Sequence, residues 1–229
     1  MRVHVALGYD ADKFVIIPNG FDLAEFKPDP ASRRDLRTEL GLDAETPLIG
    51  MSARYDPQKD HVGFVAAAAG LSAKHPGVHF VLWGDGIEPR NQTLSDAIAR
   101  AGMEKKFHLL GRRADVARIT TGLDIASLSS AYGEAFPNVI GEAMACGVPC
   151  VGTDVGDTAS IIGETGRTVA ARDPGALANA WSELISLGTE GRTALGAAAR
   201  LRAETCFSIA AMVARYEALY RQFAIPCAA

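Results

Sequence analysis

Two glutamates, Glu134 and Glu142, are separated by seven residues and surround the start of a predicted helix. Residues 124–130 form an apolar segment that predicts a strand before them, and the turn 133–138 predicts a helix that runs to Gly147. The first N–H groups of a helix are unpaired and carry partial positive charge. This arrangement predicts a site for phosphate and hydroxyl groups, and a nucleotide diphosphate presents both.

The turn and the two carboxylates suit different parts of such a ligand. Glu142 lies inside the helix, where its two acceptor oxygens match the two vicinal hydroxyls of a ribose. Glu134 precedes the turn and faces another part of the ligand. Both are also ordinary surface residues for a helix start, but the flanking glycines favour a binding role. Backbone contacts to the ligand are expected from Phe136, Pro137, Asn138 and Val139.

Arg54 and Lys59 are the expected cations of this site, since they follow a predicted strand, residues 47–54. A guanidinium holds two phosphate oxygens as a fork, and an ammonium adds a mobile point charge. We therefore expect this pair to neutralise a diphosphate. A solvated loop beside Asp56 and Asp60 is the alternative interpretation of the same residues.

Strands and helices alternate along the whole chain, which predicts an α/β fold with a doubly wound, Rossmann-like parallel sheet. The apolar segments that predict its strands are residues 14–17, 47–54, 79–84, 106–110, 124–130, 149–153 and 167–170. Such sheets bind ligands at the carboxyl ends of their strands, so the loops that follow the strands should converge on one rim. Further rim positions are Gly84, Gly86, Leu110 and Gly111.

Composition and charge are those of a globular chain with a full core. The 229 residues are 48% hydrophobic and carry a formal charge of −4, and no basic patch indicates nucleic acid. The apolar runs are too short to cross a bilayer and the amino terminus does not resemble a signal peptide, so we expect a cytoplasmic protein.

No cofactor or metal is expected from the motifs of this sequence. Phosphate-loop and dinucleotide glycine patterns are absent, and His61 and His108 are assigned no role. The cysteines lack the spacing of a zinc site or a disulfide framework, which predicts reduced and mostly buried thiols. These cysteines are Cys146, Cys150, Cys206 and Cys227.

The same motifs, in the same order, resemble the carboxy-terminal, donor-binding domain of GT-B glycosyltransferases. The segment from Glu134 to Glu142 is similar to the E-x7-E signature of retaining family 4 enzymes (glycosyl transferases group 1), which include many bacterial polysaccharide and glycolipid transferases. Arg54 and Lys59 resemble the donor-phosphate pair of this family. The resemblance extends to the entry segment 17–22 with Phe26 and Pro28, to the Gly84-Asp85-Gly86 turn and to Gly111.

The resemblance implies front-face transfer of a sugar from a UDP- or GDP-linked donor to a polysaccharide or lipid-linked acceptor. It implies that Glu134 is the catalytic residue at the sugar, that Glu142 binds the ribose and that the loop after Leu110 meets the base. It also implies a reaction without a metal, in which Arg54 and Lys59 stabilise the leaving diphosphate.

Two positions depart from the family pattern. Ala135 replaces a glycine that is common in the family, and its Cβ would crowd the loop if the backbone there were left-handed. After the next predicted strand the chain has Gly156-Asp157-Thr158 in place of a double glycine. Asp157 or Thr158 is expected to cap the following helix.

The resemblance also implies that this chain is one half of a GT-B enzyme. We expect a linker in residues 1–28, the donor domain in 29–205, and in 206–229 a helix that crosses to an amino-terminal, acceptor-binding domain. Without that domain the chain should be inactive, and any peripheral contact with the inner face of the membrane would be made by that domain. An apolar stripe in residues 207–223 either remains exposed, where self-association would cover it, or packs on the same domain.

Two other functions remain open from the sequence. One is a non-catalytic nucleotide-sugar binding subunit beside a separate acceptor-binding chain. The other is a fragment of a GT-B nucleotide-sugar epimerase, which needs no acceptor.

Overall fold

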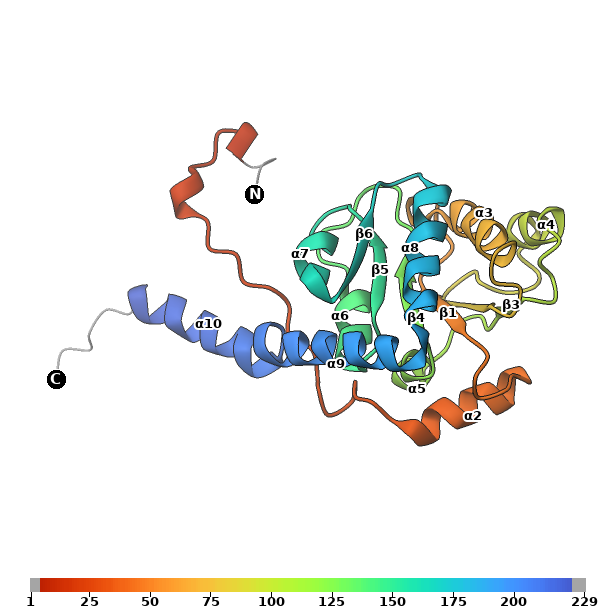
Figure 1. Ribbon diagram of the computed structural model, residues 1–229. Coiled ribbons are helices and arrows are strands. Elements are labelled where there is room, and N and C mark those ends of the chain that lie inside the picture. Colours follow the sequence, from red (N-terminus) through yellow and green to blue (C-terminus); the bar gives the residue numbers. More distant parts are fainter. Residues whose placement is uncertain (1–4, 224–229) are drawn as a thin grey trace.

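A six-stranded parallel sheet forms the centre of the molecule in a computed structural model that describes residues 5–223 (Figure 1). The strand order is β3-β2-β1-β4-β5-β6. The strands are β1 (Leu48–Ser52), β2 (His79–Trp83), β3 (Phe107–Leu109), β4 (Ile125–Leu128), β5 (Cys150–Thr153) and β6 (Gly166–Val169). The predicted fold class, a doubly wound α/β sheet, is confirmed.

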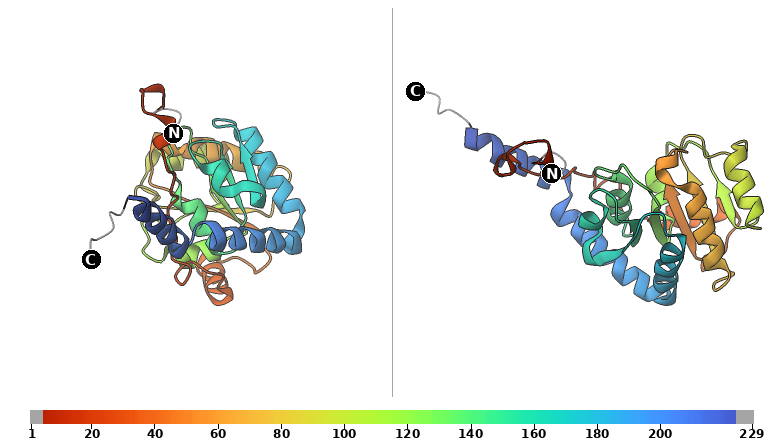
Figure 2. Two further views of the ribbon diagram at one scale, coloured as in Figure 1. Left: turned by 90° about the vertical axis from the view of Figure 1, so that its left-hand side faces the viewer. Right: turned by 90° about the horizontal axis from the view of Figure 1, so that it is seen from above.

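Helices cover both faces of this sheet (Figure 2). They are α2 (Pro30–Leu40), α3 (His61–Ser72), α4 (Gln92–Arg100), α5 (Val116–Thr121), α6 (Asn138–Ala145), α7 (Thr158–Ile162), α8 (Pro174–Ser186), α9 (Gly188–Cys206) and α10 (Ile209–Phe223), with short 3-10 helices at Ala11–Lys13, Pro57–Lys59 and Gly163–Thr165. Side chains of a strand alternate between the faces. Phe80 and Leu82 of β2 therefore pack with Phe64 and Trp181, whereas Val81 enters the second core on the opposite face.

Residues 14–17 do not form the predicted strand, so that prediction is wrong. The backbone there is not paired with the sheet, and Val15 and Ile16 are exposed. A strand requires a hydrogen-bonded neighbour, whereas this segment runs away from the sheet (Figure 1). Its apolar composition alone was therefore a misleading indication.

The entry and exit of the domain lie next to each other. Phe21 N donates to Phe207 O at 2.7 Å, and Ile209 N donates to Phe21 O at 3.2 Å. Beyond this point the amino-terminal segment and α10 both project from the same side of the domain (Figures 1 and 2). Among its described residues, α10 buries none, and Tyr220 and Phe223 are exposed.

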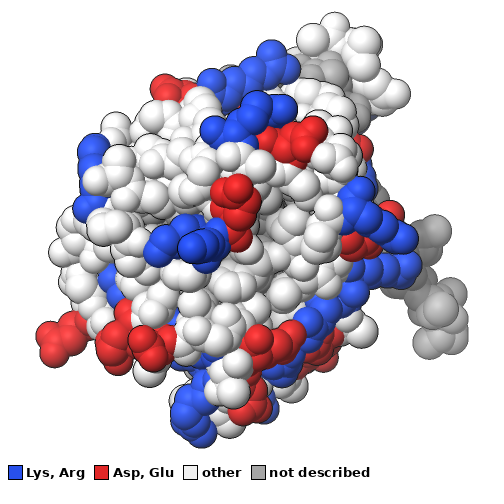
Figure 3. All heavy atoms as spheres, turned by 90° about the vertical axis from the view of Figure 1, so that its right-hand side faces the viewer, with Lys and Arg blue, Asp and Glu red and all other residues white. Residues whose placement is uncertain are grey.

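Basic and acidic side chains are interspersed on the face that carries α4 (Figure 3). Within residues 5–223, no helix combines the length and the apolar character that a membrane span requires.

Candidate functional site

The loops after β1, β2 and β3 are tied together at the carboxyl rim of the sheet. Gly84 N donates to Gly111 O at 2.9 Å, and Tyr55 N donates to Asp85 O at 2.7 Å. Gly84 has a φ of +141°, and a Cβ at this position would lie 2.1 Å from Ala53 O. Only glycine permits this close approach of the two loops.

Gly86 and Leu110 lie on the same rim as Gly84. Gly86 has a φ of +75°, close to Tyr55. Leu110 is half-buried and its N–H donates to Leu82 O at 3.0 Å, which continues the ladder beyond β3. The four predicted rim positions therefore lie on two hydrogen-bonded segments, one after β2 and one after β3.

Lys59 and Glu134 form an ion pair between the loops that follow β1 and β4. Their side chains are only 14% and 8% exposed, so water does little to weaken the attraction. The Ser130 hydroxyl donates to the same Glu134 Oε1 atom at 2.5 Å. Both contacts use Oε1, so Oε2 can accept a hydrogen bond from a ligand.

Gln58 holds these two loops together, although the sequence analysis did not single it out. Its backbone carbonyl oxygen accepts a hydrogen bond from Ala131 N at 2.8 Å, and its side-chain amide donates to Gly133 O at 2.9 Å. Its position between Arg54 and Lys59 was the only signal in the sequence. The Glu134 loop is thus positioned by the loop that carries the predicted cations.

Arg54 has a different environment from Lys59. Its side chain is 58% exposed, with Nε 3.3 Å from Asp56 Oδ2 and Nη2 3.3 Å from Gln58 Oε1. Such an exposed pair contributes little to stability. Arg54 is therefore free to exchange these partners for a ligand anion at the rim.

The start of α6 has no side-chain cap. Pro137 occupies the N-cap position, where its ring cannot accept a hydrogen bond. The backbone N–H groups of Asn138 and Val139 remain available to a ligand, whereas Ile140 N donates to Pro137 O at 3.1 Å. Asn138 Oδ1 accepts a hydrogen bond from Asn19 Nδ2 at 2.9 Å. The rings of Phe136 and Phe21 stack with their centroids 6.1 Å apart. The entry segment therefore supports the turn from outside, and Val139 in the first helical turn is half-buried.

Ala135 does not strain the turn, because the only non-glycine residues with positive φ among residues 5–223 are Asp60 and Arg172. The glycine that this loop requires is Gly156, whose φ is +62° and whose added Cβ would lie 2.3 Å from Glu134 O. The predicted capping of α7 is wrong in detail. Asp157 occupies the N-cap position without a side-chain bond, and the Thr158 hydroxyl donates to Val155 O.

Glu142 is half-buried on α6, and burial raises the pKa of its carboxyl group above the usual value of 4.5. The nearby charge of Glu25 raises it further. A raised pKa in the folded state means that the ionised carboxylate opposes folding.

We expect Glu142→Gln to raise the free energy of unfolding at pH 7 by about 0.5–2 kcal/mol, because the amide does not carry the buried charge. Above the raised pKa the gain is complete, and it fades as the pH falls towards 4.5 and the wild-type carboxyl becomes protonated. Thermal unfolding at neutral and acidic pH measures this. Glu25→Gln should give a smaller gain, and a less stable Glu142→Gln protein at pH 7 would contradict the explanation.

One family of known proteins matches most of this chain. Residues 46–186, more than half of the chain, match the model of the family described as Glycosyl transferases group 1. The chain belongs to this family.

Two glycosyltransferases are similar to this chain in sequence. A UDP-Gal:alpha-D-GlcNAc-diphosphoundecaprenol alpha-1,3-galactosyltransferase of Escherichia coli is 33% identical over 149 residues, which cover 64% of this chain and 38% of the enzyme. A D-inositol 3-phosphate glycosyltransferase of Corynebacterium glutamicum is 29% identical over 221 residues, covering 92% and 52%. The chain thus spans about half or less of these relatives.

Anabaena HepE has a similar solved structure. Its complex with UDP superposes with a TM-score of 0.88 at 26% identity, covering 96% of this chain and 61% of HepE, and a complex with UDP-glucose gives 0.85. The structural neighbours of the chain are glycosyltransferases of the GT-B fold.

Among the described residues, His61 lies beside the rim, with its ring centroid 5.3 Å from that of Tyr55. His61 is buried at the start of α3, and burial lowers its pKa to about 4, so its ring is neutral. His108 packs beside His79. Cys146 and Cys150 are free and buried, as predicted, and burial raises the pKa of Cys146 to about 12. Cys206 is half-buried, and Cys227 lies outside the described residues.

Proposed function

We propose that this chain is the donor-binding, carboxy-terminal part of a retaining glycosyltransferase of family 4 that uses a nucleotide-diphosphate sugar. The observation that carries the proposal is the buried Lys59–Glu134 pair at the carboxyl rim, next to the uncapped start of α6. It places a cation, a carboxylate and free N–H groups within one loop system. Of the two predicted donors, UDP- and GDP-linked sugars, the name of the Escherichia coli relative and the UDP complexes of HepE support the UDP-linked one.

Each part of the donor has a proposed partner. Arg54 is the exposed cation that approaches the diphosphate, and Lys59 adds a second charge while holding Glu134. Glu134 accepts a sugar hydroxyl through Oε2 beside the leaving group, and Glu142 accepts the ribose hydroxyls. Backbone N–H groups of the turn contact sugar and phosphates, and the loop of Leu110 and Gly111 meets the base.

The acceptor side of the enzyme is proposed to lie outside this chain. Residues 1–28 would link to an amino-terminal, acceptor-binding domain, 29–205 would be the donor domain, and 206–229 would cross back to that partner. The isolated β-bridge between Phe21 and Ser208 supports this arrangement, as do the exposed apolar side chains of α10. The isolated chain would then bind the donor without transferring sugar, and self-association through α10 is a further consequence.

Calorimetric titration of the chain with UDP, GDP, ADP and uridine tests the donor site. We expect one diphosphate to bind selectively, Glu142→Ala to weaken it, and Arg54→Ala with Lys59→Ala to weaken the diphosphate far more than uridine. Arg221→Ala, on exposed α10, is the matched control and should bind like wild type. If the double variant lost affinity for UDP and for uridine by the same factor relative to wild type, the phosphate assignment would be refuted.

A further inference from the structure

A cavity lies at the opposite end of the sheet from the rim. It encloses about 310 Å³ and is lined by residues that precede strands, including Asp124 before β4 and Pro149 before β5. In a parallel sheet these positions mark the amino edge, whereas Lys59 and Glu134 follow strands. The cavity is therefore separate from the proposed donor site and does not depend on it.

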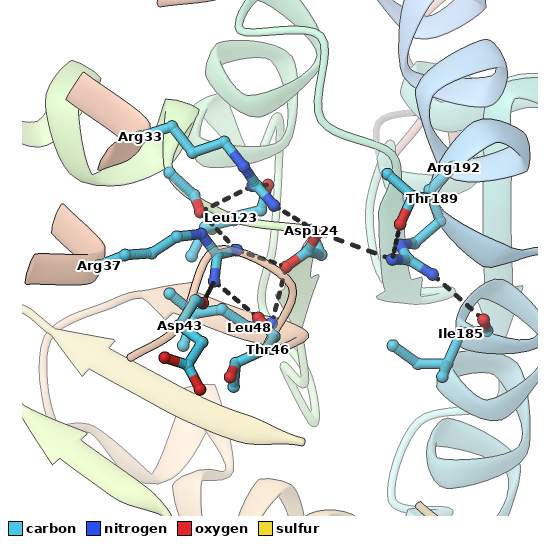
Figure 4. A network of polar contacts seen from close by, with 11 residues as sticks. Arg33, Arg37, Asp43, Thr46, Leu48, Leu123, Asp124, Ile185, Thr189 and Arg192 are labelled. Carbon is cyan, nitrogen blue, oxygen red and sulfur yellow. Dashed lines mark hydrogen bonds and ion pairs between the residues drawn. The ribbon is translucent and has the colours of Figure 1, made fainter. Parts of the chain in front are cut away.

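Three arginines surround one buried carboxylate beside this cavity. Arg33 Nη2 donates to Asp124 Oδ1 at 2.8 Å, and Arg37 Nη2 donates to Asp124 Oδ2 at 2.7 Å. Arg192 Nη2 is 3.8 Å from Asp124 Oδ1. Figure 4 shows Arg33 and Arg192 approaching Asp124 from opposite sides, on α2 and α9, and both line the cavity.

The carboxylates do not balance these guanidinium groups. Asp124 is shared, and its remaining capacity is used by Leu48 N, which donates to Oδ2 at 2.8 Å. Asp29 also lines the cavity, but its oxygens accept from Ala31 N and from the Ser32 hydroxyl at the start of α2. Three guanidinium groups therefore share the single negative charge of Asp124, and the ion pair of Arg192 with it is the longest, at 3.8 Å.

Arg192 is the least compensated of the three arginines. Its side chain is 8% exposed, and its Nε atom is buried with no hydrogen-bond partner. Its other contacts are neutral, to Ile185 O at 3.1 Å and to Thr189 Oγ1 at 3.5 Å. A buried guanidinium whose one ion pair is long and shared with two other arginines is poorly compensated, and a bound anion would offset that cost.

We propose that this cavity binds a phosphate group, either free or on a small phosphomonoester, between Arg33 and Arg192. Guanidinium groups hold phosphate oxygens through paired N–H donors. The hydroxyls of Thr121, Thr189 and Thr193 on the walls add neutral donors. The volume is at the lower end of the range for small-molecule sites, about 300–1,000 Å³, and apolar walls at Leu123 and Val148 leave room for an organic part.

Amide NMR shifts of the ¹⁵N-labelled chain, titrated at constant ionic strength with inorganic phosphate and separately with glycerol phosphate, test this site. We expect saturable shifts in residues 121–124 and 189–193 that Arg54→Ala, at the rim, leaves unchanged. Arg192→Met should weaken this binding about tenfold or more, as expected for the loss of a charged hydrogen bond. Tighter binding of glycerol phosphate would identify a phosphomonoester, and equal binding would identify free phosphate.

Arg33→Gln is a second variant for the case in which Arg192→Met does not fold, because the Arg33 side chain is 31% exposed. It should also weaken the binding of phosphate while the spectrum remains dispersed. Shifts confined to rim residues 54–59 and 134–138, shifts that rise linearly without saturation, or unchanged affinity in folded Arg33→Gln would each overturn the proposal.

Discussion

Asp124→Asn is expected to lower the free energy of unfolding by about 3–5 kcal/mol, the cost of removing one partner from a buried ion pair. The Asp124 and Arg37 side chains are 7% and 3% exposed. The neutral amide retains the shape of the carboxylate and an oxygen for Leu48 N, but it leaves the charge of Arg37 without its anion. Burial already lowers the pKa of Arg37, which shows how poorly solvated this guanidinium is.

Urea denaturation measures this effect, with Asp43→Asn as the matched control. Asp43 is exposed and only its backbone oxygen accepts from Arg37, so its side-chain substitution should change stability by less than about 0.5 kcal/mol. A loss below about 1 kcal/mol for Asp124→Asn would mean that water or neighbouring dipoles solvate Arg37 better than its burial indicates.

Lys59→Met should reduce both stability and donor binding. It leaves the buried Glu134 carboxylate with Ser130 as its remaining partner, which should cost about 3 kcal/mol or more. It also removes a cation from the proposed diphosphate site, and the loss of one charged hydrogen bond corresponds to about 10- to 100-fold in UDP affinity. Denaturation and calorimetry measure the two effects separately.

Two comparisons separate these contributions. In the double variant Lys59→Met/Glu134→Gln no buried charge is left unpaired, so part of the stability should return while UDP binding remains weak. Arg54→Met should weaken UDP binding with little change in stability, because Arg54 is exposed. Wild-type stability and affinity in Lys59→Met would refute the assigned role of the ion pair.

Local sequence patterns predicted the strands of the sheet but not which loop position requires a glycine. Apolar runs bounded by turn residues predicted the six strands of the sheet within a few residues, because a buried parallel strand requires such a run. The same rule failed at residues 14–17, where no neighbouring strand is available. The family resemblance indicated Ala135 as a position where a Cβ would crowd a left-handed loop, whereas the positive φ and the close backbone contact occur at Gly156.

By itself, the sequence determined the fold class, the family and the loops that carry Arg54, Lys59, Glu134 and Glu142, since each of these follows from a local pattern. Only the tertiary structure decided which charges meet. Lys59 and Glu134 are 75 positions apart, and Arg37 and Asp124 are 87 positions apart. Periodicity describes the face of one element, whereas an ion pair depends on the strand order that places two elements side by side. Asp124 therefore appeared only as the first residue of a predicted strand, although burial between α2 and α9 makes it the anion on which three arginines converge.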